Sequence, residues 1–360
     1  ADAGGEPSLR GLCAQTRVVI STVGPYALYG EPLVRVCAET GTDYCDLTGE
    51  VQWIRRMLQR YEDKARASGA RIVHCCGFDS IPSDLGVHFL QQQAIERLGE
   101  PCTRVKMRVK AMRGGFSGGT VASVLNLVKE ATSNPALRKE LANPYSICPE
   151  GYAPEVRQPN VQSAQFDDDF DAWVAPFVMS AINTRIVQRS NALSKQAYGA
   201  DFLYDEAVLT GRGLKGRLAA TGLGAGLAGF MVAGAVPPTR WALERFVLPG
   251  PGEGPSAEAQ KTGFFDLRFV GKTADAFGEQ VARTEETAGG RNGRRERGIA
   301  CKLGQQLGSL GGLLDGLVNV VRHVIRPTPL VEPAATAAWP IDSGDGAREK
   351  RARPDGPRPF

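Results

Sequence analysis

Short apolar runs and amphipathic stretches take turns along the first hundred residues. The runs are brief and partly β-branched, which is typical of strands covered on both faces; they are residues 18–23, 43–47 and 71–75. A helical spacing of apolar positions follows each run, at residues 33–39, at residues 51–68, and in a third stretch capped by Ser83. The order predicted is strand, helix, strand, helix, strand, helix.

This alternation with short connections predicts part of a doubly wound parallel sheet. We therefore expect a partial Rossmann-like domain over residues 1–100. The carboxyl ends of parallel strands meet at one edge of the sheet, where ligands bind. Residues 24–30, 46–50 and 77–84 should share that edge.

The pattern changes after residue 100. Residues 103–112 alternate apolar with basic side chains, which predicts an antiparallel strand with one dry face and one solvated face. A Gly-rich stretch at 114–120 precedes a predicted helix, and residues 202–209 and 264–270 are further strand candidates. We expect a second, α+β domain over residues 101–273, so the predicted class is α/β with a partial parallel sheet and an α+β domain.

Two stretches fit this plan poorly. Residues 218–236 form 19 consecutive positions without a charge, and a buried hairpin or helix is the first interpretation, ahead of a membrane or lipid-surface contact or a full span. Residues 274–360 are rich in Arg, Gly and Pro. We expect this tail to be largely disordered, apart from a helix at 313–325.

Charge and cysteine content narrow the range of functions and cellular compartments. The net charge is +4, but the stretch 271–360 holds 14 Lys and Arg against 11 Asp and Glu, so it accounts for +3. No basic stripe interleaved with aromatic residues precedes residue 290, which argues against nucleic-acid binding. The eight cysteines form no CxxC pair and the first residues do not have the pattern of a signal peptide, so we expect the reducing cytoplasm.

Other chemistries lack their motifs. The three histidines show no metal-ligand spacing, so we expect no metal site. The sequence contains no Gly-x-Ser-x-Gly elbow, which argues against a hydrolase of that type.

The three loops carry recognisable residues: Val19 to Gly30 (VISTVGPYALYG), Gly41 to Glu50 (GTDYCDLTGE) and Gly77 to Asp84 (GFDSIPSD). In this order they resemble the saccharopine dehydrogenase-like oxidoreductases, most closely the trans-acting enoyl reductase branch. The similarity continues through further short motifs, namely 114–120, Arg189-Ser190-Asn191, Tyr204-Asp205-Glu206 and 250–269. It covers roughly residues 16–273.

The resemblance implies a nucleotide-binding domain, a second domain that closes over the cofactor, and reduction with NADP or NAD. For the branch it implies reduction of an enoyl group on a lipid or polyketide intermediate that a polyketide synthase carries, during glycolipid assembly. It also implies contact with the plasma membrane or lipid droplets, and a homodimer is a further expectation. Family members carry a GxGxxG-type phosphate loop that this sequence does not show.

Candidate site residues follow from the loops. For the cofactor they are Thr22, Gly24, Pro25, Tyr26, Asp79 and Ser80, and for the substrate they are Ser117, Gly118, Thr120 and Arg189. Tyr26, or alternatively Tyr29, is a candidate proton donor. The structural alternatives are a simple turn at Gly24-Pro25, a helix cap at 79–84, a solvated turn at Asp46 and Glu50, and a surface ion pair at Arg189. The rival class is a non-catalytic lipid-associated protein.

Overall fold

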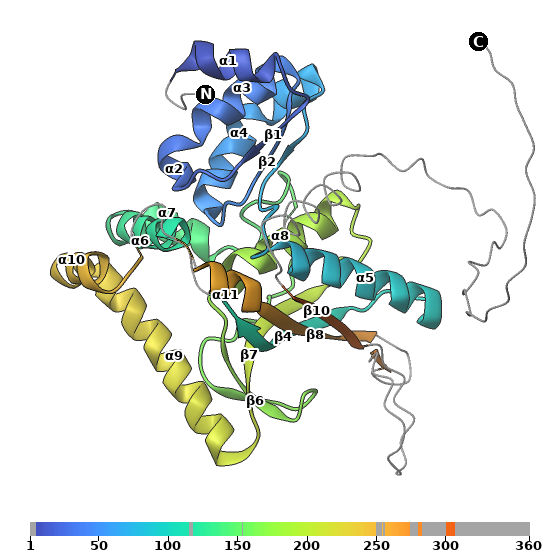
Figure 1. The fold of residues 1–360 in the computed structure, drawn as a ribbon. Helices are drawn as coiled ribbons and strands as arrows, with labels where there is room; N and C mark the ends of the chain where they lie inside the picture. Colours follow the sequence, from blue (N-terminus) through green and yellow to red (C-terminus); the bar gives the residue numbers. More distant parts are fainter. Residues whose placement is uncertain are drawn as a thin grey trace, which may run out of the picture.

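The computed structural model describes residues 5–114, 118–152, 154–249, 254, 256–273, 280–282 and 300–306. These residues form a three-stranded sheet near the N-terminus and a seven-stranded sheet further along the chain, which lie in separate layers (Figure 1). The predicted α/β class, a partial Rossmann-like parallel sheet beside an α+β domain, is confirmed.

The first sheet is parallel, with the strand order β1-β2-β3. Its strands are β1 (Val18–Ser21), β2 (Asp43–Asp46) and β3 (Ile72–Val73), and its helices are α1 (Glu6–Cys13), α2 (Tyr26–Tyr29), α3 (Glu31–Thr40) and α4 (Val51–Ser68). Helix α4 has the bounds that the sequence predicted. Gly41 and Gly69 end α3 and α4 in the left-handed region, at φ +76° and +79°, where glycine has no Cβ to clash.

The core of this unit consists of large apolar side chains from the strands and helices. Val34, Tyr44, Trp53 and Ile54 are buried. Removing each such side chain from water contributes roughly 1.5–3 kcal/mol. Ile147 and Ile182, from the predicted second domain, join the same cluster, so the two predicted domains share a packed interface.

The second sheet has the order β10-β8-β4-β7-β6-β5, and β9 pairs with β8. Its strands are β4 (Arg104–Arg113), β5 (Gln165–Asp167), β6 (Ala172–Pro176), β7 (Leu203–Gly211), β8 (Phe264–Thr273), β9 (Gln280–Ala282) and β10 (Ala300–Gln306). Strand β4 runs antiparallel to β8, as predicted, but parallel to β7.

The polar face of β4 is only partly solvated, which corrects part of the prediction: Lys110 is exposed, but Arg108 is buried. The guanidinium of Arg108 is buried and lies 2.7 Å from a carboxylate oxygen of Asp167 and 2.7 Å from one of Asp205. Lys106 lies 3.0 Å from Asp167 and 2.5 Å from Asp169. A buried charge is tolerated when it is paired, so the strand is covered on both faces around Arg108, whereas Lys110 near its end is exposed.

Helix α5 (Ile81–Leu98) begins earlier than predicted, with Ser80 as its N-cap residue, and Ser83 is buried inside its first turn. The helix packs on the second sheet rather than on the first. A Cβ at Gly86 would collide with the ring of Phe269, so only glycine allows this close approach of helix to strand. The sequence-based domain boundary near residue 100 therefore separates α5 from the core on which it packs.

Helices surround the second sheet on several sides (Figure 1). They are α6 (Gly118–Ser133), α7 (Pro135–Ala142), α8 (Ser180–Leu193), α9 (Gly213–Ala235), α10 (Pro237–Phe246) and α11 (Ala257–Thr262). The stretch 218–236 lies in α9 apart from its last residue, Val236, which caps the helix, and its predicted burial is wrong. Only 11% of its apolar window is buried, although its length and composition would suit a membrane span.

The tail is described only in part. Residues 280–282 and 300–306 extend the second sheet as β9 and β10. The rest of 274–360, including the helix expected at 313–325, lies outside the described residues.

Candidate functional site

The three loops predicted to share an edge do meet at the carboxyl ends of β1, β2 and β3. Tyr26 joins the first two. Its buried hydroxyl donates to the backbone oxygen of Ser21 at 2.9 Å and accepts from the backbone nitrogen of Leu47 at 3.2 Å. The ring therefore holds the end of β1 against the loop that follows β2.

Asp46 joins the second and third loops. Its side chain is 0% exposed, and Oδ1 accepts from the backbone nitrogens of Thr48 and Cys75, at 3.1 and 3.0 Å. Its Oδ2 lies 2.6 Å from Nδ1 of His74. The solvated turn expected here is wrong, because the carboxylate is a buried connector between β2 and the chain after β3.

Glu50 joins the first loop to helix α6. It is only 1% exposed, and its carboxylate accepts from the backbone nitrogens of Tyr26 and Ala27, at 2.7 and 3.0 Å, and from the hydroxyl of Ser123 at 2.8 Å. The first two donors belong to the N-terminus of α2, where partial positive charge attracts anions. The protein's own carboxylate therefore occupies that anion position.

The remaining candidate cofactor residues differ in exposure. Thr22 and Asp79 are exposed at the edge, Gly24 and Pro25 are half-buried, and Ser80 is buried. The edge thus presents a hydroxyl and a carboxylate beside the rigid Gly24-Pro25 turn, whose peptide bond is cis. These groups suit a sugar or carboxamide, which offers several hydrogen-bonding atoms.

The hydroxyl of Tyr26 is poorly placed to give up a proton. Its hydrogen is directed to Ser21, and burial, with the nearby Asp46 carboxylate adding to it, raises the pKa of the phenol well above its usual range. Tyr29 is exposed on α2. In this geometry Tyr26 positions the loops.

A second polar cluster, which we call the junction cluster, links α5, α8 and β7. It consists of Ser83, Asp84, Asn183, Ser190, Tyr204 and Glu206. The Ser190 hydroxyl donates to Asp84 at 2.9 Å, and the Asn183 amide donates to Ser83 and Glu206, at 3.2 and 3.1 Å. Three motifs that carry the resemblance, far apart in the sequence, therefore meet at one place. Sequence reasoning treated them separately and missed this.

The carboxyl groups of the junction cluster have altered acidity. Burial raises the pKa of Glu206 to about 7, against which hydrogen bonds from Tyr204, Ser83 and Asn183 act. Burial also raises the pKa of Asp84 to about 6, and the Ser190 hydrogen bond opposes it. Near neutral pH both groups titrate, although Glu206 is buried and does not face solvent.

The candidate substrate residues are spread over two helices. Gly118 and Thr120 lie in the first turn of α6, and Ser117 lies outside the described residues. Arg189, on α8, donates to the backbone oxygen of Ile147, and burial lowers its pKa. The charge of Arg189 is used within the fold, not in the surface ion pair that was the alternative.

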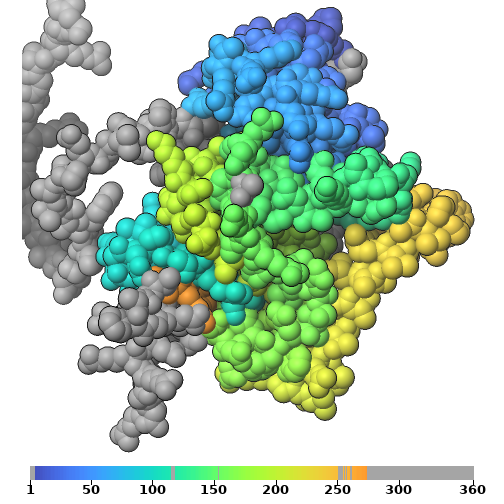
Figure 2. Space-filling model, turned by 180° about the vertical axis from the view of Figure 1, so that it is seen from behind, coloured from blue at the N-terminus to red at the C-terminus, as the bar shows by residue number. Residues whose placement is uncertain are grey.

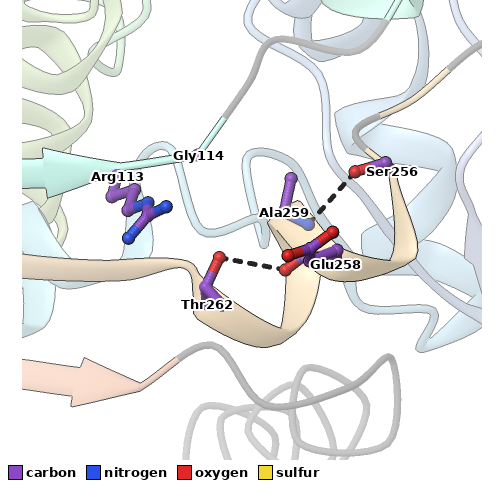
Figure 3. A pocket seen from close by; sticks show the side chains of 6 residues that line it. All are labelled: Arg113, Gly114, Ser256, Glu258, Ala259 and Thr262. Carbon is purple, nitrogen blue, oxygen red and sulfur yellow. Dashed lines mark hydrogen bonds between the residues drawn. The ribbon is translucent and has the colours of Figure 1, made fainter.

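A cavity of about 280 Å³ opens where β4 ends and the predicted substrate loop begins. Figure 3 shows Arg113 and Gly114 on the β4 side and α11 on the other. The lining residues are Arg113, Gly114, Ser256, Glu258, Ala259 and Thr262. Among the residues that the structure describes, no group of three or more His, Cys, Asp or Glu could hold a metal ion.

Comparison with known proteins gives a consistent set of relatives. The chain is 42% identical over 280 residues to a candidate trans-acting enoyl reductase of Mycobacterium tuberculosis, and 39% identical over 280 and 279 residues to trans-acting enoyl reductases of Mycobacterium bovis and Mycobacterium ulcerans. Each alignment covers 74% of this chain and 66% of the relative, so the chain spans slightly less than two thirds of their length. No family model matches the sequence. The chain is thus similar to trans-acting enoyl reductases over three quarters of its own length.

Proposed function

We propose that this chain acts as a cytoplasmic enoyl reductase that uses NADP or NAD. Its substrate would be a lipid-like acyl intermediate carried by a separate polyketide synthase during glycolipid assembly. The similarity to trans-acting enoyl reductases is the observation that carries the proposal. The loops gathered at the carboxyl edge of the parallel sheet support it, because cofactors bind at such edges.

The described residues fit one end of a dinucleotide and not its middle. Thr22, Asp79 and the Gly24-Pro25 turn present polar groups that suit a nicotinamide and its ribose. The N-terminus of α2 does not suit a pyrophosphate, because Glu50 already fills it. We therefore assign to Thr22, Asp79 and the Gly24-Pro25 turn only contacts with the nicotinamide end of the cofactor. The bound cofactor would supply a hydride to the double bond.

The chain's own residues contribute position rather than proton transfer. Tyr26 fixes the first loop against the second, and Asp46 fixes the second against the third. Glu50 and Ser123 tie this edge to α6, which carries Gly118 and Thr120. The arrangement would hold an acyl group that enters beside α6 next to the nicotinamide end of the cofactor.

Titration of the full chain with NADPH and NADH, followed by nicotinamide fluorescence, tests the proposal. We expect saturable enhancement that weakens about tenfold or more in Asp79→Ala, because a hydrogen bond to a charged group contributes about 1.5–3 kcal/mol. Asp63→Ala, on the exposed side of α4, is the control and should bind as the wild type does. Reduction of an acyl-carrier-bound enoyl group by the same preparations completes the test.

Absence of binding at millimolar cofactor would contradict the proposal. That result would favour the second candidate, a non-catalytic lipid-associated protein. The specific observation for this candidate is the carboxylate of Glu50 at the anion position of α2. Equal weakening in Asp79→Ala and Asp63→Ala would instead remove the assignment of the carboxyl edge.

A further inference from the structure

Large apolar side chains gather on the surface of α9 and α10. Nine of the nineteen large hydrophobic residues that are exposed in the described part of the chain lie between Leu214 and Val247. They include Leu218 at 63% exposed, Val232 at 65%, Trp241 at 61% and Phe246 at 73%. Figure 2 shows these helices as a ridge along one side of the molecule. Large apolar side chains exposed in such number on two neighbouring helices are typical of an interaction site.

Helix α9 uses only a narrow strip of its surface to hold itself to the protein. A Cβ at Gly216 would collide with the backbone of Gly211, and one at Gly234 would lie 3.1 Å from Leu125. On the other side, Cβ atoms at Gly222, Gly226 and Gly229 would meet nothing within 4 Å. The helix is fixed along one side, and its opposite side faces away from the described residues.

Positive charge accompanies this apolar surface. Residues 213–249 contain Lys215, Arg217, Arg240 and Arg245 and a single acidic residue, Glu244. Arg217 lies over the ring of Trp173. Lys215 and Arg245 are exposed near opposite ends of the ridge, and no described residue forms an ion pair with either. An apolar helix with basic residues at its ends matches the groups of an anionic lipid surface.

We infer that the ridge formed by α9 and α10 docks on an anionic lipid surface. The helix would lie along that surface, with Leu218 and Val232 in the acyl boundary and Lys215 and Arg245 at the headgroups. A membrane span is disfavoured because it would separate the side of α9 that carries Gly216 and Gly234 from the residues on which it packs. This inference rests on the ridge alone and holds whether or not the chain is a reductase.

A second copy of the chain is a poorer occupant of the ridge. In a two-fold dimer the same surface meets itself. An antiparallel pairing of α9 would bring Lys215 beside the basic C-terminal end around Arg245, and a parallel pairing would bring each basic end beside its copy. Both pairings place like charges together with only Glu244 to offset them. Lipid phosphate provides the opposite charge.

Flotation of the full chain with vesicles tests the inference. We expect it to float with vesicles of phosphatidylcholine mixed with phosphatidylglycerol, and much less with phosphatidylcholine alone. Lys215→Glu with Arg245→Glu should lower the partition coefficient about 25-fold or more, since each basic residue near the surface contributes about fivefold. Leu218→Glu with Val232→Glu should abolish flotation.

A matched control uses an exposed pair on another helix. Ile95→Glu with Arg97→Glu, on α5, changes the same kinds of side chain and should float as the wild type does. Quenching of Trp241 fluorescence by brominated lipid, lost in Trp241→Phe, should report insertion of α10. All these positions are exposed, so folding is checked by unchanged circular dichroism.

Three results would overturn the inference. One is wild-type protein that stays below the vesicles. Another is equal flotation of the wild type and the Leu218, Val232 variant. A third is a dimer in solution, seen by sedimentation equilibrium, that Leu218→Glu with Val232→Glu dissociates while vesicles bind nothing, which would assign the ridge to a second copy.

Discussion

The carboxyl edge of the parallel sheet buries charged side chains, whereas the α9–α10 ridge exposes apolar ones. At the edge, the carboxylates of Asp46 and Glu50 are buried and accept hydrogen bonds from backbone N–H groups and, for Glu50, from the Ser123 hydroxyl. On the ridge, the apolar residues Leu218 and Val232 are 63% and 65% exposed. Both arrangements are unfavourable unless something compensates them.

The difference lies in where the compensation comes from. Backbone N–H groups and a serine hydroxyl inside the fold offset the burial of Glu50. Nothing inside the described part of the chain covers the ridge, and under the inference above a lipid surface compensates its exposure. Loss of a group at the edge should therefore change stability, whereas loss of a group on the ridge should change binding.

The largest expected effect is that of Glu50→Ala. The variant leaves the nitrogens of Tyr26 and Ala27 and the hydroxyl of Ser123 without their acceptor. Each unsatisfied buried donor costs about 1–3 kcal/mol, so we expect the free energy of unfolding to fall by roughly 3–5 kcal/mol. Urea denaturation followed by circular dichroism measures it.

Glu62→Ala is the control for this prediction. Glu62 lies on α4 and pairs with Arg66 one turn away at the surface, where an ion pair contributes little. We expect a change of at most about 0.5 kcal/mol. Similar losses in the two variants would show that Glu50 does not hold the edge together.

The next effect concerns pH and the junction cluster. The pKa of Glu206 is about 7 in the folded protein and lower when the chain is unfolded, so folding takes up a proton between about pH 4.5 and 7. The free energy of unfolding should fall as pH rises through that range. Glu206→Gln removes this pH-dependent part of the free energy of unfolding, roughly 2–3 kcal/mol. The smaller pH-dependent contribution of Asp84, with its pKa of about 6, remains.

Urea denaturation of the wild type and of Glu206→Gln at pH 5 and pH 8 measures the contribution of Glu206 to the pH dependence of the free energy of unfolding. The stability of Glu206→Gln relative to the wild type should rise between the two values. Any cost of placing an amide beside Asn183 is the same at both pH values and cancels in the comparison. An unchanged difference would mean that Glu206 is ionised throughout and that the junction cluster does not titrate as stated.

Local signals in the sequence predicted much of the fold. Helix α4 was predicted to the residue because its amphipathic spacing ends at Gly69, which needs a positive φ. The class and the shared edge of three loops followed from the alternation of strands and helices. Long-range packing was not predicted: α5 crosses to the second sheet because Gly86 fits against Phe269, a contact between residues 183 positions apart (269 − 86).

The errors have a common physical cause. A charged residue in a loop or on one face of a strand usually faces water. The sequence therefore predicted that Glu50 and the polar face of β4 around Arg108 would be solvated. Their partners lie far along the chain, at Ser123 for Glu50 and at Asp167 and Asp205 for Arg108. In the same way, apolar residues are usually buried, so the apolar run in α9 was expected to be buried. Composition shows what a segment requires, but not which distant residue or other molecule supplies it.

The smallest expected effect separates the two sides of α9. Gly222→Ala should raise the free energy of unfolding by about 0.5–1 kcal/mol, because alanine loses less backbone entropy than glycine in a helix and its methyl group meets open space. Gly216→Ala, six positions earlier (222 − 216), should lower it, since its methyl group would strike the Gly211 backbone. Thermal denaturation of both variants measures the contrast. Destabilisation by Gly222→Ala in the absence of lipid would show that the open side of α9 is already covered by the protein, and the ridge would then need no outside partner.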